Sequence, residues 1–388
     1  MLRMNKLFAG FVIWVMCVGF CAPVSAEGAQ AKGLWVTCIG DSRVLESRAA
    51  IDKAVAFAKK NGFSTIFVQV FRADKAWFDS AIADASPFKE NRKKAGTDTL
   101  KVLIDAAHEQ GIEVHAWINT LTLSANRNAK LLHRAGNRIL TKDQHGRAAL
   151  TDAKDKWDEY YQREEQLFLE PGDPTVRDHV IGVVKEIATK YPKLDGIHFD
   201  YIRYPAAPPY IPGSRFNYVG ISYGYGRENV KRFKAKHKKD PHKLSFAESA
   251  IWDDWKREQV TSLIREAAKE ARAANPKLQI SSAVLAAYDR AYLASYQEWP
   301  RWVSEGIVDF VVLMNYSKDT RYVAYMTKAA RGLAGAKVRV GLGAYLLAEK
   351  PQILKAQIQD AAATGTGVVL FDYDSLLGSP ELAAAARS

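Results

Sequence analysis

Residues 195–205 read Asp-Gly-Ile-His-Phe-Asp-Tyr-Ile-Arg-Tyr-Pro, which predicts a buried strand followed by a polar and aromatic turn. Side chains alternate between the two faces of a strand, so His198 and Asp200 share one face, and Asp200 lies nearer the carboxyl end. At that end of a parallel strand, a carboxylate stands where barrel enzymes collect their catalytic groups. We therefore take Asp200 as the first catalytic candidate.

Seven further apolar segments resemble this strand, and they alternate with helical patterns along the chain. Eight strands predict the α/β class with a closed (β/α)8 TIM barrel. An open doubly wound sheet would instead carry a glycine-rich phosphate loop, which follows none of these segments. The expected strands are residues 33–39, 64–71, 113–119, 196–204, 279–285, 309–317, 337–345 and 367–373.

Two of the connections are unusually long: residues 120–173 after the third strand and residues 205–250 after the fourth. Both follow the carboxyl ends of strands, where long loops typically build substrate clefts. The second is rich in tyrosine, proline and glycine, which favours an ordered flap. Without a linker or an internal repeat, the simplest organisation is a single domain over residues 32–388.

The first 26 residues predict a cleaved export signal. Arg3 and Lys6 precede an apolar run over residues 7–20, which is short for a membrane span, and small residues lead up to Ala26. We expect a periplasmic or secreted protein in which Cys38 is the only remaining cysteine. Cleavage lowers the formal charge of +12 by two, to +10. For such a basic exported protein, peripheral contact with the anionic envelope is a more natural expectation than nucleic acid.

Amides, aromatic rings and charged groups gather at the predicted barrel mouth. Sugars are recognised by flat aromatic faces and by fixed polar groups that bind their hydroxyls, so this mixture indicates a polysaccharide substrate. Any single tryptophan here could equally belong to the core, and each histidine could be a hydrogen-bonded structural residue. The candidate substrate-binding residues are Gln69, Arg72, His115, Trp117, Asn119, His198, Arg203, Asn315, Tyr316, Tyr345 and Asp374.

Glycoside hydrolysis usually needs two carboxylic groups, and the sequence leaves the second one open. Glu298 and Asp372 are carried forward as catalytic candidates, with Asp374 and Glu170 as alternatives. Each of them could instead cap a helix or hold a loop, and Asp200 itself could pair with Arg203. No metal or other cofactor is expected, because the chain has neither His-x-His nor His-Glu-x-x-His.

Segments spread over nearly the whole chain resemble the glycosyl-hydrolase-like family 10 barrels of bacterial envelopes. The resemblance is carried by residues 33–36, 67–70, 115–119, 169–177, 195–201, 252–258 and 302–309. It implies a glycoside hydrolase that acts on an amino-sugar polysaccharide of the cell envelope. One member of the family cleaves peptidoglycan glycan strands that have lost their stem peptides.

Two departures limit what the resemblance implies. Many relatives carry paired acidic residues after the fourth strand, whereas Tyr201 follows Asp200 here. Substrate-assisted chitinases have an aspartate and a glutamate where this chain has His198 and Ile202, so their mechanism is disfavoured. A catalytically silent glycan-binding barrel and a hydrolase of another exopolysaccharide stay open as alternatives.

Overall fold

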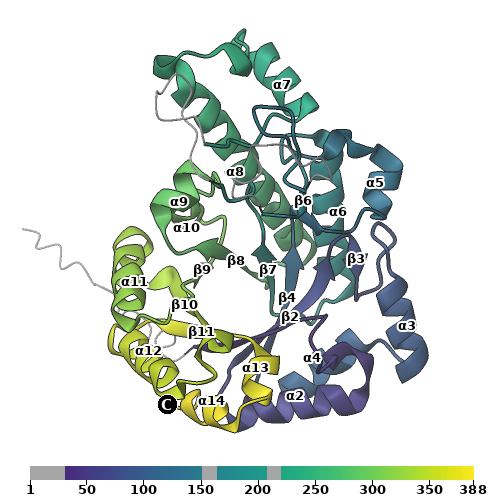
Figure 1. The fold of residues 1–388 in the computed structure, drawn as a ribbon. Coiled ribbons are helices and arrows are strands. Elements are labelled where there is room, and N and C mark those ends of the chain that lie inside the picture. Colours follow the sequence, from purple (N-terminus) through teal and green to yellow (C-terminus); the bar gives the residue numbers. More distant parts are fainter. Residues whose placement is uncertain (1–30, 151–163, 208–219) are drawn as a thin grey trace, which may run out of the picture.

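The computed structural model describes residues 31–150, 164–207 and 220–388. Eight parallel strands form a closed barrel, because the last strand pairs with the first (Figure 1). The predicted TIM barrel is therefore confirmed. Its strands are β1 (Lys32–Val36), β2 (Thr65–Arg72), β4 (Glu113–Asn119), β7 (Gly196–Asp200), β8 (Gln279–Leu285), β9 (Phe310–Met314), β10 (Val338–Gly343) and β11 (Gly367–Phe371).

Helices surround the barrel, and several begin at residue types that are typical of helix starts. The Asp173 side chain accepts a hydrogen bond from the backbone N–H of Thr175, and Pro174 starts the helix. The helices are α2 (Arg48–Lys60), α3 (Ser86–Ala95), α4 (Thr99–Glu109), α5 (Lys130–Ala135), α6 (Pro174–Lys190), α7 (Arg227–His237), α8 (Ser249–Ala274), α9 (Tyr288–Leu293), α10 (Trp299–Ser304), α11 (Thr320–Ala334), α12 (Pro351–Ala363), α13 (Tyr373–Leu377) and α14 (Pro380–Ala385).

Alternation along the strands separates two apolar layers. Outward-facing residues such as Leu34 and Ile197 pack under the helices in one continuous core. Inward-facing residues fill the barrel itself, where Trp35, Phe67 and Trp117 form a separate aromatic cluster. The barrel interior is therefore packed with side chains.

The fourth barrel strand is shorter than predicted. It ends at Asp200 rather than at residue 204, because Tyr201 adopts a left-handed conformation with φ of 51°. An extended strand cannot continue through such a residue. This turn fixes Asp200 as the last residue of β7 and therefore places it at the barrel mouth.

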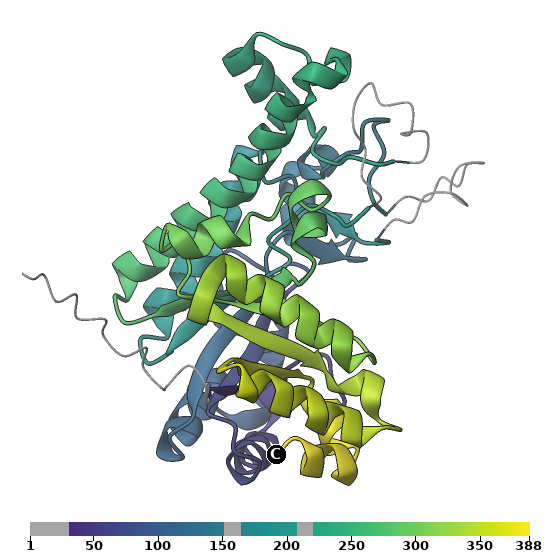
Figure 2. The same ribbon diagram turned by 90° about the vertical axis from the view of Figure 1, so that its left-hand side faces the viewer.

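The two long connections carry structure of their own. The one after β4 contains α5 and an antiparallel pair, β5 (Thr122–Ser124) and β6 (Leu167–Phe168). The one after β7 contains α7, which stands away from the barrel with the first half of α8 (Figure 2). A short strand β3 (Lys75–Ala76) pairs with the end of β2.

The predicted export signal lies outside the described residues. Within the described ranges, none of the helices is long and apolar enough to cross a membrane. The expectation of export therefore rests on the sequence of residues 1–26 alone.

Candidate active site

A pocket of about 400 Å³ opens at the carboxyl end of the barrel. This volume falls in the range that proteins use for small ligands and single sugar units. Residues from β1, β2, β4, β7, β8, β9 and β11 or from the loops directly after them contribute to it. The lining residues are Trp35, Thr37, Ile39, Gly40, Gln69, Arg72, Trp117, Asn119, Asp200, Tyr201, Ala283, Met314, Tyr316, Phe371 and Asp372.

Asp200 is the buried carboxyl group of this pocket, with only 7% of its surface exposed. Its Oδ1 accepts a hydrogen bond of 2.7 Å from the Tyr201 backbone N–H, and its Oδ2 accepts one of 3.2 Å from the Trp117 indole. Burial raises the pKa of Asp200 to about 6, although these two donors and the nearby charges of Arg203 and Arg72 act in the opposite direction. At neutral pH, Asp200 is therefore a mostly ionised carboxylate that is more basic than usual.

A chain of fixed polar groups crosses three neighbouring strands beside Asp200. The Gln69 Oε1 accepts hydrogen bonds from the Cys38 backbone N–H at 3.4 Å and from its thiol at 3.2 Å. The Gln69 Nε2 donates to the Asn119 Oδ1 at 3.0 Å, which sets the orientation of both amides. Burial raises the pKa of the Cys38 thiol to about 12, so it stays protonated as a donor. The amide pair is therefore held in one orientation at the pocket.

Asp372 brings a second carboxyl group to the same pocket. It caps α13, where its Oδ1 accepts hydrogen bonds from the Ser375 backbone N–H at 3.1 Å and from its hydroxyl at 2.5 Å. Tyr316 lines the same pocket as the two acids. Its pKa is raised well above the usual value by burial first, and then by the charges of Asp200 and Asp372 among others. The Tyr316 phenol is therefore neutral and able to donate a hydrogen bond.

Aromatic rings form the walls of the pocket. Trp35 lies 6.5 Å from Trp117 and 6.0 Å from Phe371, measured between ring centroids. Phe371 in turn stacks on Tyr316 at 5.7 Å, and Tyr345 meets both rings from the rim. Such surfaces suit the apolar face of a pyranose ring.

The two predicted histidines lie below the pocket and not in it. His198 is fully buried between Trp35 and Phe67, and its Nδ1 is 2.8 Å from the Ser281 hydroxyl. His115 is also fully buried, with its Nε2 3.8 Å from the Glu113 carboxylate. Burial lowers the pKa of both imidazoles, and most strongly that of His198. They are neutral barrel-core residues, because each lies one inward position before the first pocket-lining residue of its strand, which is Trp117 for His115 and Asp200 for His198.

Five other predicted site residues also fall outside the pocket lining, and one of them, Tyr345, contacts the lining rings of Tyr316 and Phe371. The Glu298 carboxylate lies 3.2 Å from the Arg301 guanidinium at the start of α10, and Asn315 donates to the Val323 carbonyl oxygen. Asp374 accepts from the Ser42 backbone N–H at 2.7 Å and so holds the loop that follows β1. Arg203 pairs with the Glu164 carboxylate through both terminal nitrogens, at 3.0 and 2.9 Å, rather than with Asp200.

Glu170, the remaining alternative for the second acid, is fully buried between the two long connections. Its Oε1 accepts from the Tyr204 hydroxyl at 2.7 Å and from the Gly172 N–H at 3.2 Å. Its Oε2 accepts from the Thr141 hydroxyl at 2.9 Å and from the Gly226 N–H at 3.2 Å. Burial raises the pKa of Glu170. With four donors satisfied inside the protein, this carboxyl group joins loops and does not face a ligand.

Ser222 belongs to the same buried region. It is the central residue of a Gly-x-Ser-x-Gly pattern at residues 220–224, a spacing also found around serine nucleophiles. The Lys256 ammonium donates to the Ser222 hydroxyl at 2.6 Å and also contacts the Tyr296 hydroxyl. Ser222 is only 3% exposed and does not line the barrel pocket. The pattern therefore marks a structural cluster.

Sequence reasoning missed several residues that line the pocket. Trp35 and Phe371 could have been found by alternation, since they face inward with Gly33 and Val369 and are the last inward residues of their strands. Tyr201 could not, because alternation places it outside the barrel until its left-handed backbone turns it.

Comparison with known proteins identifies the chain. The glycosyl hydrolase-like 10 family model matches residues 30–361. The chain belongs to the glycosyl hydrolase-like 10 family. As a member of this family, it is a glycoside hydrolase, an assignment that the curated relatives below share by name.

Two curated relatives align with most of this chain. The glycosyl hydrolase DigH of Escherichia coli K12 is 24% identical over 368 residues, which are 86% of this chain and 76% of DigH. The glycosyl hydrolase YngK of Bacillus subtilis 168 is 23% identical over 328 residues, which are 78% of this chain and 57% of YngK.

Solved structures of more distant proteins share the fold. The catalytic domain of a Paenibacillus polymyxa β-amylase superposes with a TM-score of 0.55 at 14% identity, covering 89% of this chain and 93% of that domain. A β-galactosidase from Marinomonas ef1 gives a TM-score of 0.57 at 12% identity, covering 92% of this chain and 58% of the other. At such low identity, these matches show the barrel architecture alone.

Proposed function

We propose that this protein is an exported hydrolase of a cell-envelope amino-sugar polysaccharide, and that its substrate is the glycan strand of peptidoglycan. The observation that carries the proposal is the presence of Asp200 and Asp372 in one aromatic-walled pocket. Two carboxyl groups at the scissile bond are the usual requirement of glycoside hydrolysis. The resemblance to envelope proteins and the export signal support the substrate and the location.

Asp200 takes the role of the ionised carboxylate, as nucleophile or as the base that activates water. Both of its oxygens accept hydrogen bonds from N–H groups that cannot themselves accept, and this arrangement favours the charged form. Its pKa of about 6 makes it a stronger base than an ordinary aspartate while leaving about nine in ten molecules ionised at pH 7.

Asp372 takes the second role, proton donation to the leaving glycosidic oxygen. Of the four acids considered from the sequence for this role, it is the only one in the pocket lining, whereas Glu298, Asp374 and Glu170 are bound elsewhere. The remaining lining groups position the sugar: the Gln69 and Asn119 amides bind hydroxyls, and the Arg72 guanidinium supplies positive charge beside Asp200.

The test is digestion of purified peptidoglycan glycan strands, with and without their stem peptides, by the purified protein. We expect new reducing ends and shortened oligosaccharides by mass spectrometry, and loss of both with Asp200→Asn. Removing an essential carboxylate should lower kcat by about 10³-fold or more. Binding without new reducing ends would instead identify a silent glycan-binding barrel. Cleavage of only other exopolysaccharides would overturn the proposed substrate.

A further inference from the structure

Helix α7 and the first half of α8 form a projection that stands away from the barrel (Figure 1, Figure 2). The two helices are held together by a small aromatic cluster that is separate from the barrel core. Within it, the fully buried Phe233 of α7 meets Trp252 and Trp255 of α8, with ring centroids 4.8 and 5.8 Å apart. The projection therefore has a core of its own, and the other side of α7 faces solvent.

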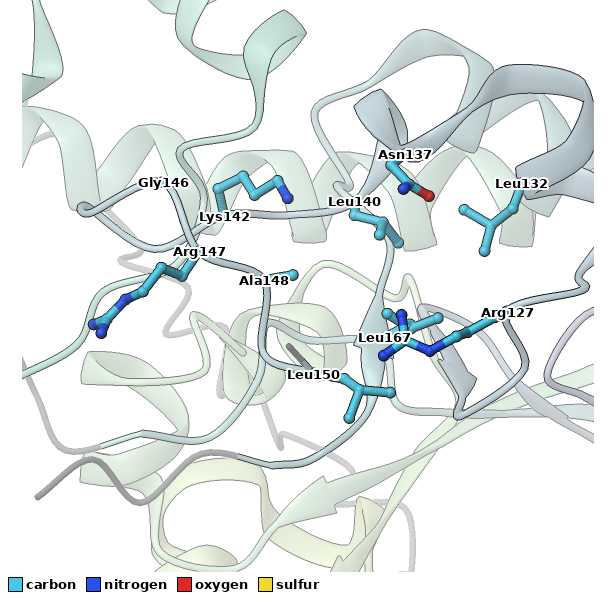
Figure 3. A pocket seen from close by; sticks show the side chains of 10 residues that line it. All are labelled: Arg127, Leu132, Asn137, Leu140, Lys142, Gly146, Arg147, Ala148, Leu150 and Leu167. Carbon is cyan, nitrogen blue, oxygen red and sulfur yellow. The ribbon is translucent and has the colours of Figure 1, made fainter. Parts of the chain in front are cut away.

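The base of the projection is tied to the connection that follows β4. The Lys142 backbone oxygen accepts hydrogen bonds from the N–H groups of Gly224 and Tyr225, at 3.1 and 2.9 Å, just before α7 begins. Lys142 also lines a cavity of about 440 Å³ within that connection (Figure 3). Residues of α7 and α8 are not among the described residues that line this cavity. The projection is therefore anchored at its base, and its outer surface is separate from the cavity.

Residues 227–248 concentrate the positive charge of the chain. They contain eight lysines and arginines and three acidic residues, a net +5 of the formal +12 that all 388 residues carry. In the part of the chain that the structure describes, the three acidic residues are already engaged in ion pairs, so five cations are left over. The pairs are Lys231 with Glu228 at 3.7 Å, Lys234 with Asp240 at 2.7 Å, and Lys239 with Glu248.

Three of the remaining cations, Lys236, Lys238 and Lys243, are exposed at the end of α7 and in the turn that follows it. No acidic side chain of the described ranges forms an ion pair with them. The Lys236 ammonium lies 5.5 Å from the centroid of the Trp255 ring, and Lys238 ends α7 with a left-handed φ of 56°. The outer end of α7 therefore presents positive charge that the protein does not neutralise.

Phe246 lies beside these lysines and is 60% exposed. The backbone around it is fixed, because the Ser245 hydroxyl donates to the Glu248 carboxylate at 2.9 Å and the Ser249 hydroxyl donates to the Phe246 carbonyl oxygen at 2.8 Å. The ion pair between Glu248 and Lys239 ties this turn to the end of α7. An exposed phenyl ring and the unneutralised lysines therefore share one corner of the projection.

We propose that this corner binds the surface of a bilayer that contains anionic phospholipid. The ammonium groups of Lys236, Lys238 and Lys243 attract the lipid phosphates, and the Phe246 ring enters the boundary between headgroups and acyl chains. A soluble polyanion would match the charge equally well, but it would leave the phenyl ring in water. The proposal does not rest on the proposed function, because neither Asp200 nor a glycan takes part.

The test is co-sedimentation with lipid vesicles. The protein lacks residues 1–26, so that their apolar run cannot bind lipid, and it retains every described residue. One set of vesicles is phosphatidylcholine alone, and the other contains equal parts of phosphatidylcholine and phosphatidylglycerol. We expect binding to the mixed vesicles only, and we expect added salt to weaken it, because exposed charges are screened. Equal binding to the two sets would overturn the proposal.

Removal of the three unneutralised charges should produce the largest loss. A variant with Lys236→Gln, Lys238→Gln and Lys243→Gln should bind the mixed vesicles about 100-fold more weakly, since each lysine near an anionic surface contributes about fivefold. All three side chains are exposed, so its urea denaturation curve should match that of the parent protein. Unchanged vesicle binding by this variant would overturn the proposal.

The matched control removes the same charge from the opposite end of the molecule. Lys53→Gln and Lys60→Gln on α2, combined with Lys93→Gln on α3, change three exposed lysines far from α7 (Figure 1). This variant should keep its binding to the mixed vesicles within a few fold. An equal loss in both triple variants would mean that net charge, and not the projection, is responsible, and would contradict the proposal.

Phe246→Ser separates a bilayer from a soluble polyanion. It should weaken vesicle binding by about tenfold, because an apolar ring leaves the interface, and it should leave binding to inorganic polyphosphate unchanged. Tyr325→Ser, at a 68% exposed aromatic residue of α11, is the matched control and should bind like the parent protein. If Phe246→Ser also binds vesicles like the parent protein, the surface recognises polyanions in general and the bilayer proposal is wrong. The assay contains no glycan, so that failure would leave the proposed hydrolase activity untouched.

Discussion

Asp200 and Glu170 are both buried carboxyl groups with raised pKa values. They differ in how many of their hydrogen-bonding positions the protein already occupies and in whether a ligand can reach them. Glu170 accepts four hydrogen bonds from the two long connections and is not among the described residues that line the barrel pocket. Asp200 accepts two and lies in the wall of an open pocket. The comparison teaches that burial and a shifted pKa do not by themselves mark a catalytic acid. What distinguishes Asp200 from Glu170 is its place in the lining of an open pocket.

The largest effects should come from removing acids of the pocket, beginning with Asp372. Asp372→Asn should lower kcat on peptidoglycan strands by about 10²- to 10⁴-fold, because proton donation to the leaving oxygen is lost. Activity should return on an aryl glycoside whose leaving group needs no proton. Glu298→Gln is the matched control, and a change of more than a few fold in its kcat would reopen the choice of the second acid.

Glu170→Gln should reduce stability rather than chemistry. Each Glu170 oxygen faces one backbone N–H, from Gly172 or Gly226, so the amide NH₂ of glutamine must oppose a donor whichever way it turns. A buried donor left without its acceptor costs about 1 to 3 kcal/mol, and the change disturbs the neighbouring hydroxyl bonds as well. Urea denaturation should therefore show a loss of about 3 kcal/mol. Wild-type stability in this variant would mean that Glu170 does not hold the connections together.

The free energy of unfolding should depend on pH in a way that reports the raised pKa of the buried Asp200. Its pKa rises from 3.8 to about 6 on folding, so the folded protein binds this proton more tightly than the unfolded chain does. The stabilising contribution is fully present below pH 4 and is lost as the pH rises to about 6. Asp200→Asn should remove this pH-dependent fall in the free energy of unfolding, which amounts to at most about 3 kcal/mol. Parallel curves for the two proteins between pH 4 and 7 would contradict the shift.

Trp117→Phe should produce the smallest effect. It removes the indole N–H that donates to Asp200 at 3.2 Å while keeping an aromatic ring in the wall. The loss should lower kcat/KM by about tenfold and move the acid limb of its pH profile upward, because the charged form of Asp200 is less stabilised. If the acid limb of the Trp117→Phe profile stays at the wild-type pH, the ionisation that this limb reports is not that of Asp200.

Local patterns were sufficient to predict the barrel and part of its mouth. Strand and helix periods depend on neighbouring residues, and alternation alone selects Gln69, Trp117 and Asn119 for the pocket. Alternation shows which side chains face the barrel interior but not how far each lies from the mouth. His115 and His198 were therefore expected at the mouth although they lie beneath it.

Loop residues depend on distant partners, and this part of the site could not be predicted. Glu170 is held by groups from three separate segments, including Thr141 and Gly226, which no local pattern connects. The direction of Glu298 likewise follows from an ion pair with Arg301 and a hydrogen bond from Thr261. Only the assembled fold separates these acids from Asp372.

The most direct test of this account measures activity per folded molecule for Asp200→Asn and Glu170→Gln side by side on peptide-free peptidoglycan strands. Folded protein is quantified by denaturation at the assay temperature. We predict that Asp200→Asn loses at least about 10³-fold in activity and remains folded, whereas Glu170→Gln loses stability and keeps its activity within a few fold. The reverse result, with an active Asp200→Asn and a folded but inactive Glu170→Gln, would contradict the assignment of the catalytic carboxylate.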